Sequence, residues 1–204
     1  MAQPWAVNLL ILVPALSYSL WRRKGLLLSS GTLLALALFG VSFGFVEAAV
    51  VVYLRAAAGI FGQYSSSTSQ LPATYQEAVT SLAQFPQNLR TIEMFREAAT
   101  MIMLGTVALL SGGKAKERWA SFLWAFAAWD ITYYVGLWAT TRWPSSLKDY
   151  DVLFLIPVPW VAQVWFPVLV SALTLLAVVL SRRNEDSNHK LFTHGSSPVQ
   201  DKQL

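Results

Sequence analysis

Long apolar segments alternate with short polar clusters along this chain of 204 residues. The apolar segments lie at about residues 5–20, 27–54, 93–112, 119–138 and 159–180. A helix needs about 20 apolar residues to cross the hydrocarbon core of a bilayer. The pattern therefore predicts an all-α, polytopic integral membrane protein. We expect residues 1–181 to form one domain, a bundle of five transmembrane helices.

Two polar segments lie outside the predicted spans. Residues 62–92 form a loop rich in Ser, Thr and Gln, in which Tyr75, Val79 and Leu82 recur at helical spacing. This spacing predicts a short amphipathic helix within the loop. Residues 182–204 are mostly polar, so we expect a disordered tail.

Basic residues predict the orientation of the bundle. Segments 21–24 and 114–118 and the tail would share one side, and together they hold ten of the 15 Lys and Arg residues, namely Arg22, Arg23, Lys24, Lys114, Lys116, Arg118, Arg182, Arg183, Lys190 and Lys202. The positive-inside rule puts this side in the cytoplasm. The N-terminus is then outside and the C-terminus inside. A chain of this kind without an organelle signal is typical of a bacterial inner membrane.

The composition agrees with a membrane protein and narrows the chemistry. Charged residues make up 13% of the chain, against about 25% in a typical soluble domain. There is no cysteine, and both histidines, His189 and His194, lie in the tail. We therefore expect no haem, iron–sulfur cluster or Cys/His zinc site in the membrane region. The basic residues lie at membrane edges, so nucleic acid is not an expected partner.

Ionisable residues fall in the half of the predicted bundle that lies opposite the basic segments. Asp130 is about 16 Å from the cytoplasmic end of its span, near the middle of the bilayer. Helical spacing brings the polar faces of three spans together. We predict an outward-facing pocket whose candidate ligand- or ion-binding residues are Glu47, Arg55, Arg96, Glu97, Asp130, Tyr133 and Tyr134.

Charge in a membrane is costly, by about 2.5–3.5 kcal/mol at the bilayer centre. Arg96 or Arg55 can neutralise Glu47 or Glu97, and the same arrangement is compatible with an ion pair that only fixes helix packing. Asp130 has no evident cationic partner. It could be protonated, bonded to a tyrosine or bound to a cation, and Glu97 with Asp130 is a weak candidate metal pair.

Three other features have plainer interpretations. Gly40 and Gly44 form a small-xxx-small pattern, which favours close packing of another helix. Glu93 would be a favourable charge near a helix N-terminus. Asp149 and Asp151 have a spacing seen in metal-binding carboxylate pairs, but we expect ordinary solvated loop residues.

Three functions stay open at this point. The first is the binding or transport of a cation or small solute from the external side. The second is a non-catalytic subunit or assembly factor, as a homo-oligomer or within a larger membrane complex. The third is a metal-assisted enzyme that acts on a lipid at the outer leaflet. No catalytic motif is found, so an enzyme is the less favoured class.

Overall fold

The structure is a computed structural model that describes residues 2–57, 74–84 and 86–183. Most of these residues are helical. The chain begins with a 3₁₀ helix, η1, that leads directly into α1. The elements are η1 (Trp5–Ile11), α1 (Leu12–Trp21), α2 (Ser30–Ala57), α3 (Tyr75–Gln84), α4 (Gln87–Leu110), α5 (Ala115–Thr141), β1 (Tyr150–Phe154), β2 (Trp160–Gln163) and α6 (Trp165–Ser181).

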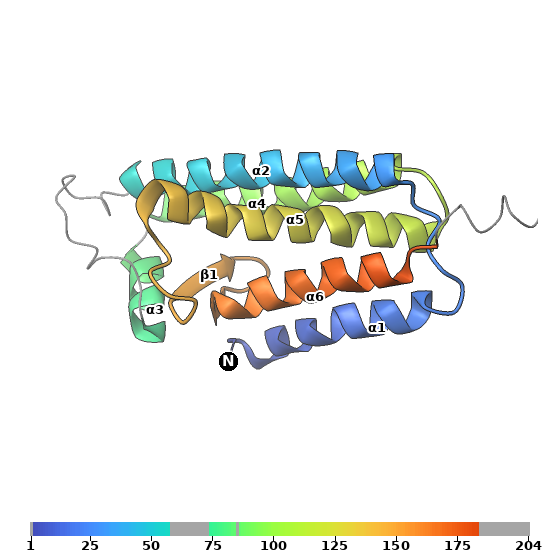
Figure 1. The fold of residues 1–204 in the computed structure, drawn as a ribbon. Coiled ribbons are helices and arrows are strands. Elements are labelled where there is room, and N and C mark those ends of the chain that lie inside the picture. The colour runs from blue at the N-terminus through green and yellow to red at the C-terminus, as the bar shows by residue number, and fades with distance from the viewer. Residues whose placement is uncertain (1, 58–73, 85, 184–204) are drawn as a thin grey trace, which may run out of the picture.

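Helix α5 lies at the centre of the arrangement. It packs against α2, α4 and α6, while α1 packs on α6 (Figure 1). The short helix α3 lies across one end of the bundle, beside the strands. This end also holds the N-terminal end of η1, whereas the C-terminal ends of α1 and α6 lie at the other end (Figure 1).

Small residues set the distance between α2 and α5. A Cβ atom on Gly40 would come within 2.6 Å of the Ala125 carbonyl oxygen, and one on Gly44 would collide with the carbonyl oxygen of Trp129. From the other helix, a Cβ on Gly136 would come within 2.8 Å of the Ala48 Cβ. The two backbones therefore approach closely along the glycine pattern of α2, as a small-xxx-small stripe allows.

A small antiparallel sheet corrects the expectation of an all-α protein. Strands β1 and β2 pair with Asp151 opposite Ala162 and Val152 opposite Val161. The N-terminal segment adds one bridge, because Gln3 and Val161 exchange two backbone hydrogen bonds of 2.8 Å. The residues of β2 were expected to begin the fifth helix. That helix, α6, starts only at Trp165, after the strand.

In the part of the chain that the structure describes, one helix is long and apolar enough to cross a membrane, as judged by length and composition. This is α2, whose segment Ser30–Ala56 contains an 18-residue stretch with a mean hydropathy of 2.2. Segments Trp5–Trp21 and Trp165–Ser181 are apolar but shorter. Helices α4 and α5 are long, but polar and ionisable residues lower the hydropathy of α4, and ionisable residues, tryptophans and tyrosines lower that of α5. The five predicted spans are thus supported only in part.

Candidate functional site

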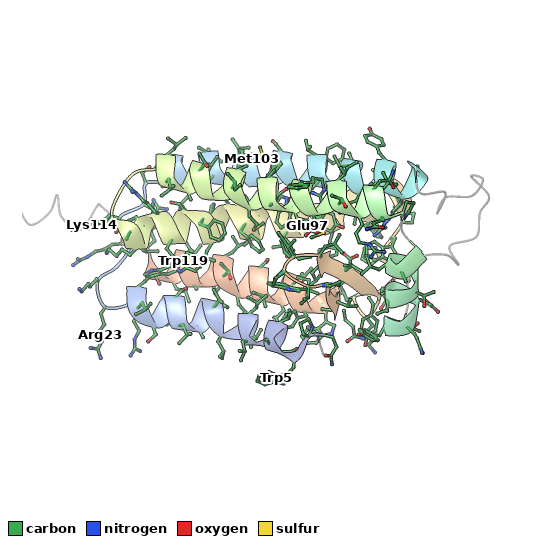
Figure 2. All side chains as sticks on the ribbon, turned by 180° about the vertical axis from the view of Figure 1, so that it is seen from behind. Trp5, Arg23, Glu97, Met103, Lys114 and Trp119 are labelled. Atoms are coloured by element: carbon green, nitrogen blue, oxygen red, sulfur yellow. The ribbon has the colours of Figure 1, made fainter. Side chains whose placement is uncertain are left out.

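A cavity of about 510 Å³ lies between α4 on one side and η1, α1 and α6 on the other. One face of α5 forms its floor, and Figure 2 shows Glu97 of α4 and Trp119 of α5 on this side of the molecule. The lining residues of α5 follow helical spacing, and they are Trp119, Phe122, Leu123, Phe126, Trp129, Asp130, Tyr133 and Tyr134. The floor is therefore apolar in its first half and polar in its second half.

Arg96 is the centre of the charged network. Its guanidinium forms ion pairs with Glu47 of α2 and with Glu93, one turn earlier on α4. The hydroxyl of Thr100 donates a 2.7 Å hydrogen bond to Oε1 of Glu47. Glu47 is thus neutralised by one cation and bonded to one hydroxyl. Glu93 belongs to this network as well, since α4 begins at Gln87 and places Glu93 within its second turn.

Glu97 is held by the backbone that follows β1. The Leu155 N–H donates to both carboxylate oxygens of Glu97, at 2.8 and 3.1 Å. Glu97 is buried and lines the cavity, and the neighbouring Arg96 forms its ion pairs with Glu47 and Glu93. The hydrogen bonds from Leu155 to Glu97 connect the loop between the two strands to α4.

Asp130 is bonded to a hydroxyl of α6 rather than to a tyrosine. Oγ of Ser171 donates a 2.8 Å hydrogen bond to Oδ2 of Asp130, and both side chains are buried. Next to it, Trp129 is 8% exposed and lines the cavity. Its indole Nε1 is buried and has no hydrogen-bond partner among the described residues. Asp130 and Trp129 thus both line the cavity, but their side chains contact different elements, since the ring of Trp129 packs against Phe126, Tyr133 and Phe154.

Asp151 completes the charged wall from the sheet. Tyr134 donates a 3.2 Å hydrogen bond to its Oδ2, and Arg55 lies 3.7 Å from its Oδ1. Burial raises the pKa of Asp151, and the nearby Arg55 guanidinium only partly offsets this rise. The Arg55 guanidinium also lies over the ring of Trp143, 4.5 Å from its centre. Among the described residues, Nη1 of Arg55 is buried without a hydrogen-bond partner.

The structure brings all seven predicted site residues to one cavity. Glu47, Arg55, Arg96, Glu97, Asp130, Tyr133 and Tyr134 all line it. The partners differ in detail from the expectation, because Arg96 pairs with Glu47 and Glu93, and Asp130 with Ser171. Gly40 and Gly44 lie behind the cavity, where α2 packs on α5.

The view of Asp149 and Asp151 as solvated loop residues was wrong, since both are buried. Asp149 accepts three hydrogen bonds of 2.8–3.0 Å from Ser145 and Ser146, which fixes the turn before β1. Asp151 belongs to the cavity instead. A signal was available, because Tyr150-Asp-Val-Leu-Phe154 is rich in strand formers, and a strand directs successive side chains to opposite faces.

Other lining residues gave no clear signal. The hydroxyls of Thr100 and Ser171 and the indole of Trp129 lie within apolar helices, where hydroxyl and indole groups are common. Their role depends on contacts between helices, which one sequence does not reveal. Within residues 2–57, 74–84 and 86–183, no group of three or more His, Cys, Asp or Glu side chains has an arrangement that could hold a metal ion.

Comparisons with protein-family models, with curated proteins and with solved structures found no match to this chain.

Proposed function

We propose that this chain is a polytopic membrane protein of a bacterial inner membrane and that its cavity binds a small organic cation from the external side. The five spans are those that the sequence predicts. The surface of the bundle, its two ends and the charge of the cavity support this proposal.

The surface of the bundle supports several spans rather than one. Only 33% of the apolar window of α2 is buried, so this helix differs from the buried core helix of a soluble protein. Large exposed apolar side chains occur on the other helices as well, among them Leu16, Leu20, Phe95, Ile102, Leu109, Leu110, Leu176 and Leu180. A soluble monomer rarely exposes apolar surface of this extent, whereas lipid tails cover it without cost.

The two ends of the bundle support the orientation. The end formed by the last turns of α1 and α6 and the first turn of α5 is basic, with Arg22, Arg23, Lys24, Lys114, Lys116, Arg118, Arg182 and Arg183. Basic residues mark the cytoplasmic side of a membrane protein. The carboxylate network lies toward the other end, so the cavity would be reached from outside the cell.

The observation that carries the choice of ligand is the charge of the cavity. Five carboxyl groups line it, those of Glu47, Glu93, Glu97, Asp130 and Asp151. The lining contains two arginines, Arg55 and Arg96, and no lysine in the described part of the chain. Arg96 pairs with Glu47 and Glu93, and Arg55 faces Asp151. Glu97 and Asp130 thus keep hydrogen bonds without an ion pair, and a protonated amine would complement them.

The test is a thermal unfolding experiment in a maltoside detergent, with butylammonium chloride as the probe and sodium chloride at equal ionic strength as reference. At about 100 times the dissociation constant, a ligand that binds only the folded state adds about 2.7 kcal/mol. For a chain of this length we expect a rise in Tm of about 5 °C or more. Asp130→Asn should remove most of this rise.

The matched control is Glu117→Gln, which neutralises a buried carboxylate outside the cavity. This variant should keep the response to butylammonium. Glu97→Gln gives a second reading if Asp130→Asn folds poorly. The proposal is wrong if butylammonium has no more effect than sodium, or if the Asp130→Asn and Glu97→Gln proteins both respond as the unmodified protein does.

A further inference from the structure

Aromatic side chains form part of the cavity lining near the carboxylates. Phe126 and Trp129 of α5, Phe154 of β1 and Trp160 of β2 all line the cavity, and we call these four residues the aromatic wall. Their rings are in contact, with centres 5.2 Å apart for Phe126 and Trp129, 6.5 Å for Trp129 and Phe154, and 5.5 Å for Phe154 and Trp160. Phe126, Phe154 and Trp160 are only half-buried, so a ligand in the cavity can reach their rings.

Both carboxylates without an ion pair are neighbours of this wall. Phe126 precedes Asp130 by four residues on α5, which places the two side chains one turn apart on the same face of the helix. Leu155, whose N–H donates to both carboxylate oxygens of Glu97, directly follows Phe154 in the chain. A cation beside either carboxylate therefore has a ring of the aromatic wall close to it.

The two carboxylates supply charge but little accessible surface. Glu97 is 6% exposed and Asp130 is 7% exposed, and both already accept hydrogen bonds. A primary ammonium has three N–H donors that need acceptors at hydrogen-bond distance, and these two side chains present few free ones. A quaternary ammonium has no N–H group to satisfy. Its charge is attracted by the carboxylates over a longer distance, and a low dielectric constant strengthens this attraction.

The aromatic wall provides the contacts that a quaternary ammonium prefers. The face of an aromatic ring is electronegative, so it attracts a cation, and a group of several rings recognises methylated ammonium groups in this way. Methyl groups that pack against these rings also remove apolar surface from water. One half of the cavity thus combines accessible aromatic rings with an excess of carboxylates.

We infer that the cation is a methylated, quaternary ammonium compound. Its charged head lies against Phe126 and Phe154 of the aromatic wall, and Glu97 and Asp130 balance its charge. The ligand enters from the external end of the cavity. This inference rests on the proposed function and narrows it from small organic cations in general to one chemical class.

Two probes that differ only in methylation test this choice of class. Butyltrimethylammonium and butylammonium have the same chain and the same charge, and each is titrated in thermal unfolding experiments in maltoside at constant ionic strength. Butyltrimethylammonium should bind about fivefold more tightly, because it gains contacts with the aromatic faces and leaves no N–H donor unsatisfied. Equal or weaker binding of the methylated probe would overturn the inference.

Fluorination of a single ring tests the contact itself. Trifluorophenylalanine in place of Phe126, or of Phe154 in a second protein, keeps an aromatic ring at the position but removes most of the negative charge from its face. Binding of butyltrimethylammonium should weaken about threefold in each protein. A ring that serves packing alone would not respond in this way.

Phe39 provides the matched control, because it is a half-buried phenylalanine of α2 outside the cavity lining. The same fluorination at Phe39 should leave binding unchanged. If the proteins fluorinated at Phe126 and at Phe154 both bind the methylated probe as the unmodified protein does, the rings do not contact the cation and the inference is wrong.

The outcomes separate this inference from the proposed function. If butylammonium stabilises the protein and Asp130→Asn removes this effect, but the methylated probe binds no more tightly, the proposed function stands and the quaternary ammonium is excluded. If neither probe raises Tm above the sodium reference, both proposals are wrong.

Discussion

Two buried glutamates at opposite ends of the bundle show two different uses of a carboxylate. Glu117 lies in the first turn of α5 and is 2% exposed; Glu97 lies on α4 and is 6% exposed. Each lies next to a basic residue in sequence, and each accepts backbone hydrogen bonds. Burial and charge alone therefore do not distinguish them.

Their surroundings do distinguish them. Glu117 accepts the N–H of Lys114, at 3.2 Å, and its Oε1 lies 3.2 Å from Nζ of Lys116, so it closes the start of its own helix. Glu97 lines a cavity to which α2, α5 and β1 contribute further carboxylates. A carboxylate whose hydrogen-bond donors lie in its own helical turn is a helix cap. Carboxylates that several elements contribute to one cavity form a candidate binding site.

The largest expected difference between the two ends is the loss of stability when the cation next to each glutamate, Arg96 or Lys116, is removed. Arg96→Met leaves Glu47 and Glu93 without their shared cation in a buried network. Removing one partner of a buried pair costs about 3–5 kcal/mol. Lys116→Met should cost at most about 1 kcal/mol, because Lys116 is partly exposed and Glu117 keeps its backbone donors. Thermal unfolding in detergent measures both.

Arg96→Lys is the conservative variant for this comparison. It keeps the charge but loses the planar fork that serves two carboxylates, so an intermediate loss is expected. Equal costs for Arg96→Met and Lys116→Met would mean that the two ends are equivalent. The ion pairs of Arg96 would then only fix the packing of the helices, which is the alternative that the sequence left open.

A smaller loss of stability is expected at the contact between α2 and α5, behind the cavity. Gly44→Ala places a methyl group against the Trp129 carbonyl, so α2 must shift from the floor of the site. Overpacking of this kind costs about 1–3 kcal/mol. Gly105→Ala on α4 is the matched control, since no atom lies within 4 Å of its added Cβ. There the same change should stabilise the helix by about 0.5–1 kcal/mol.

The two substitutions also differ in their expected effect on binding. Gly44→Ala should weaken the response to butylammonium, because the shift acts on Trp129 and the turn that carries Asp130. Gly105→Ala should leave it unchanged. If both variants bind butylammonium as the unmodified protein does, the cavity tolerates movement of its floor. The close contact between α2 and α5 then contributes to stability and not to binding.

Sequence patterns located the helices better than their ends. Apolar periodicity found the five long segments, but it began the third at residue 93 although α4 starts at Gln87. Polar first turns are invisible to hydropathy. The strand β2 was read as the start of a helix, since Trp160-Val-Ala-Gln163 has no turn residue to separate it from α6. Among the described helices only α2 is long and apolar enough to span a membrane, so the crossing of a membrane by α1, α4, α5 and α6 stays a prediction.

The candidate site could be predicted where charges interrupt apolar helices. Glu47 and Asp130 were recognisable because an ionisable residue in such a segment needs a reason. Asp151 was missed because its burial depends on β1 folding back against α5. Ser171 was missed because its partner lies 41 residues away in sequence. Contacts between elements that are distant in sequence depend on the tertiary fold, and residue patterns in one sequence do not predict them.

The smallest expected effect is a dependence of stability on pH, with opposite signs at the two ends. Burial raises the pKa of Glu117, but the hydrogen bond from Lys116 and backbone donors outweigh it, so the pKa lies below its ordinary value of 4.5. The ionised carboxylate therefore stabilises the fold above pH 4.5, and this contribution is lost as pH falls through the folded-state pKa. Glu117→Gln should cost about 1 kcal/mol at neutral pH, as the loss of a helix cap does.

Asp151 titrates in the opposite sense. Burial raises its pKa above the ordinary value of 3.8, so ionisation destabilises the folded state as pH rises past that value. The stability difference between the unmodified protein and Asp151→Asn should then shrink with rising pH, while the difference for Glu117→Gln should grow. Unfolding curves between acidic and neutral pH measure both slopes. Slopes of the same sign would show that Arg55 holds Asp151 as firmly as Lys116 and the backbone hold Glu117, and the contrast between cap and cavity would fail at this residue.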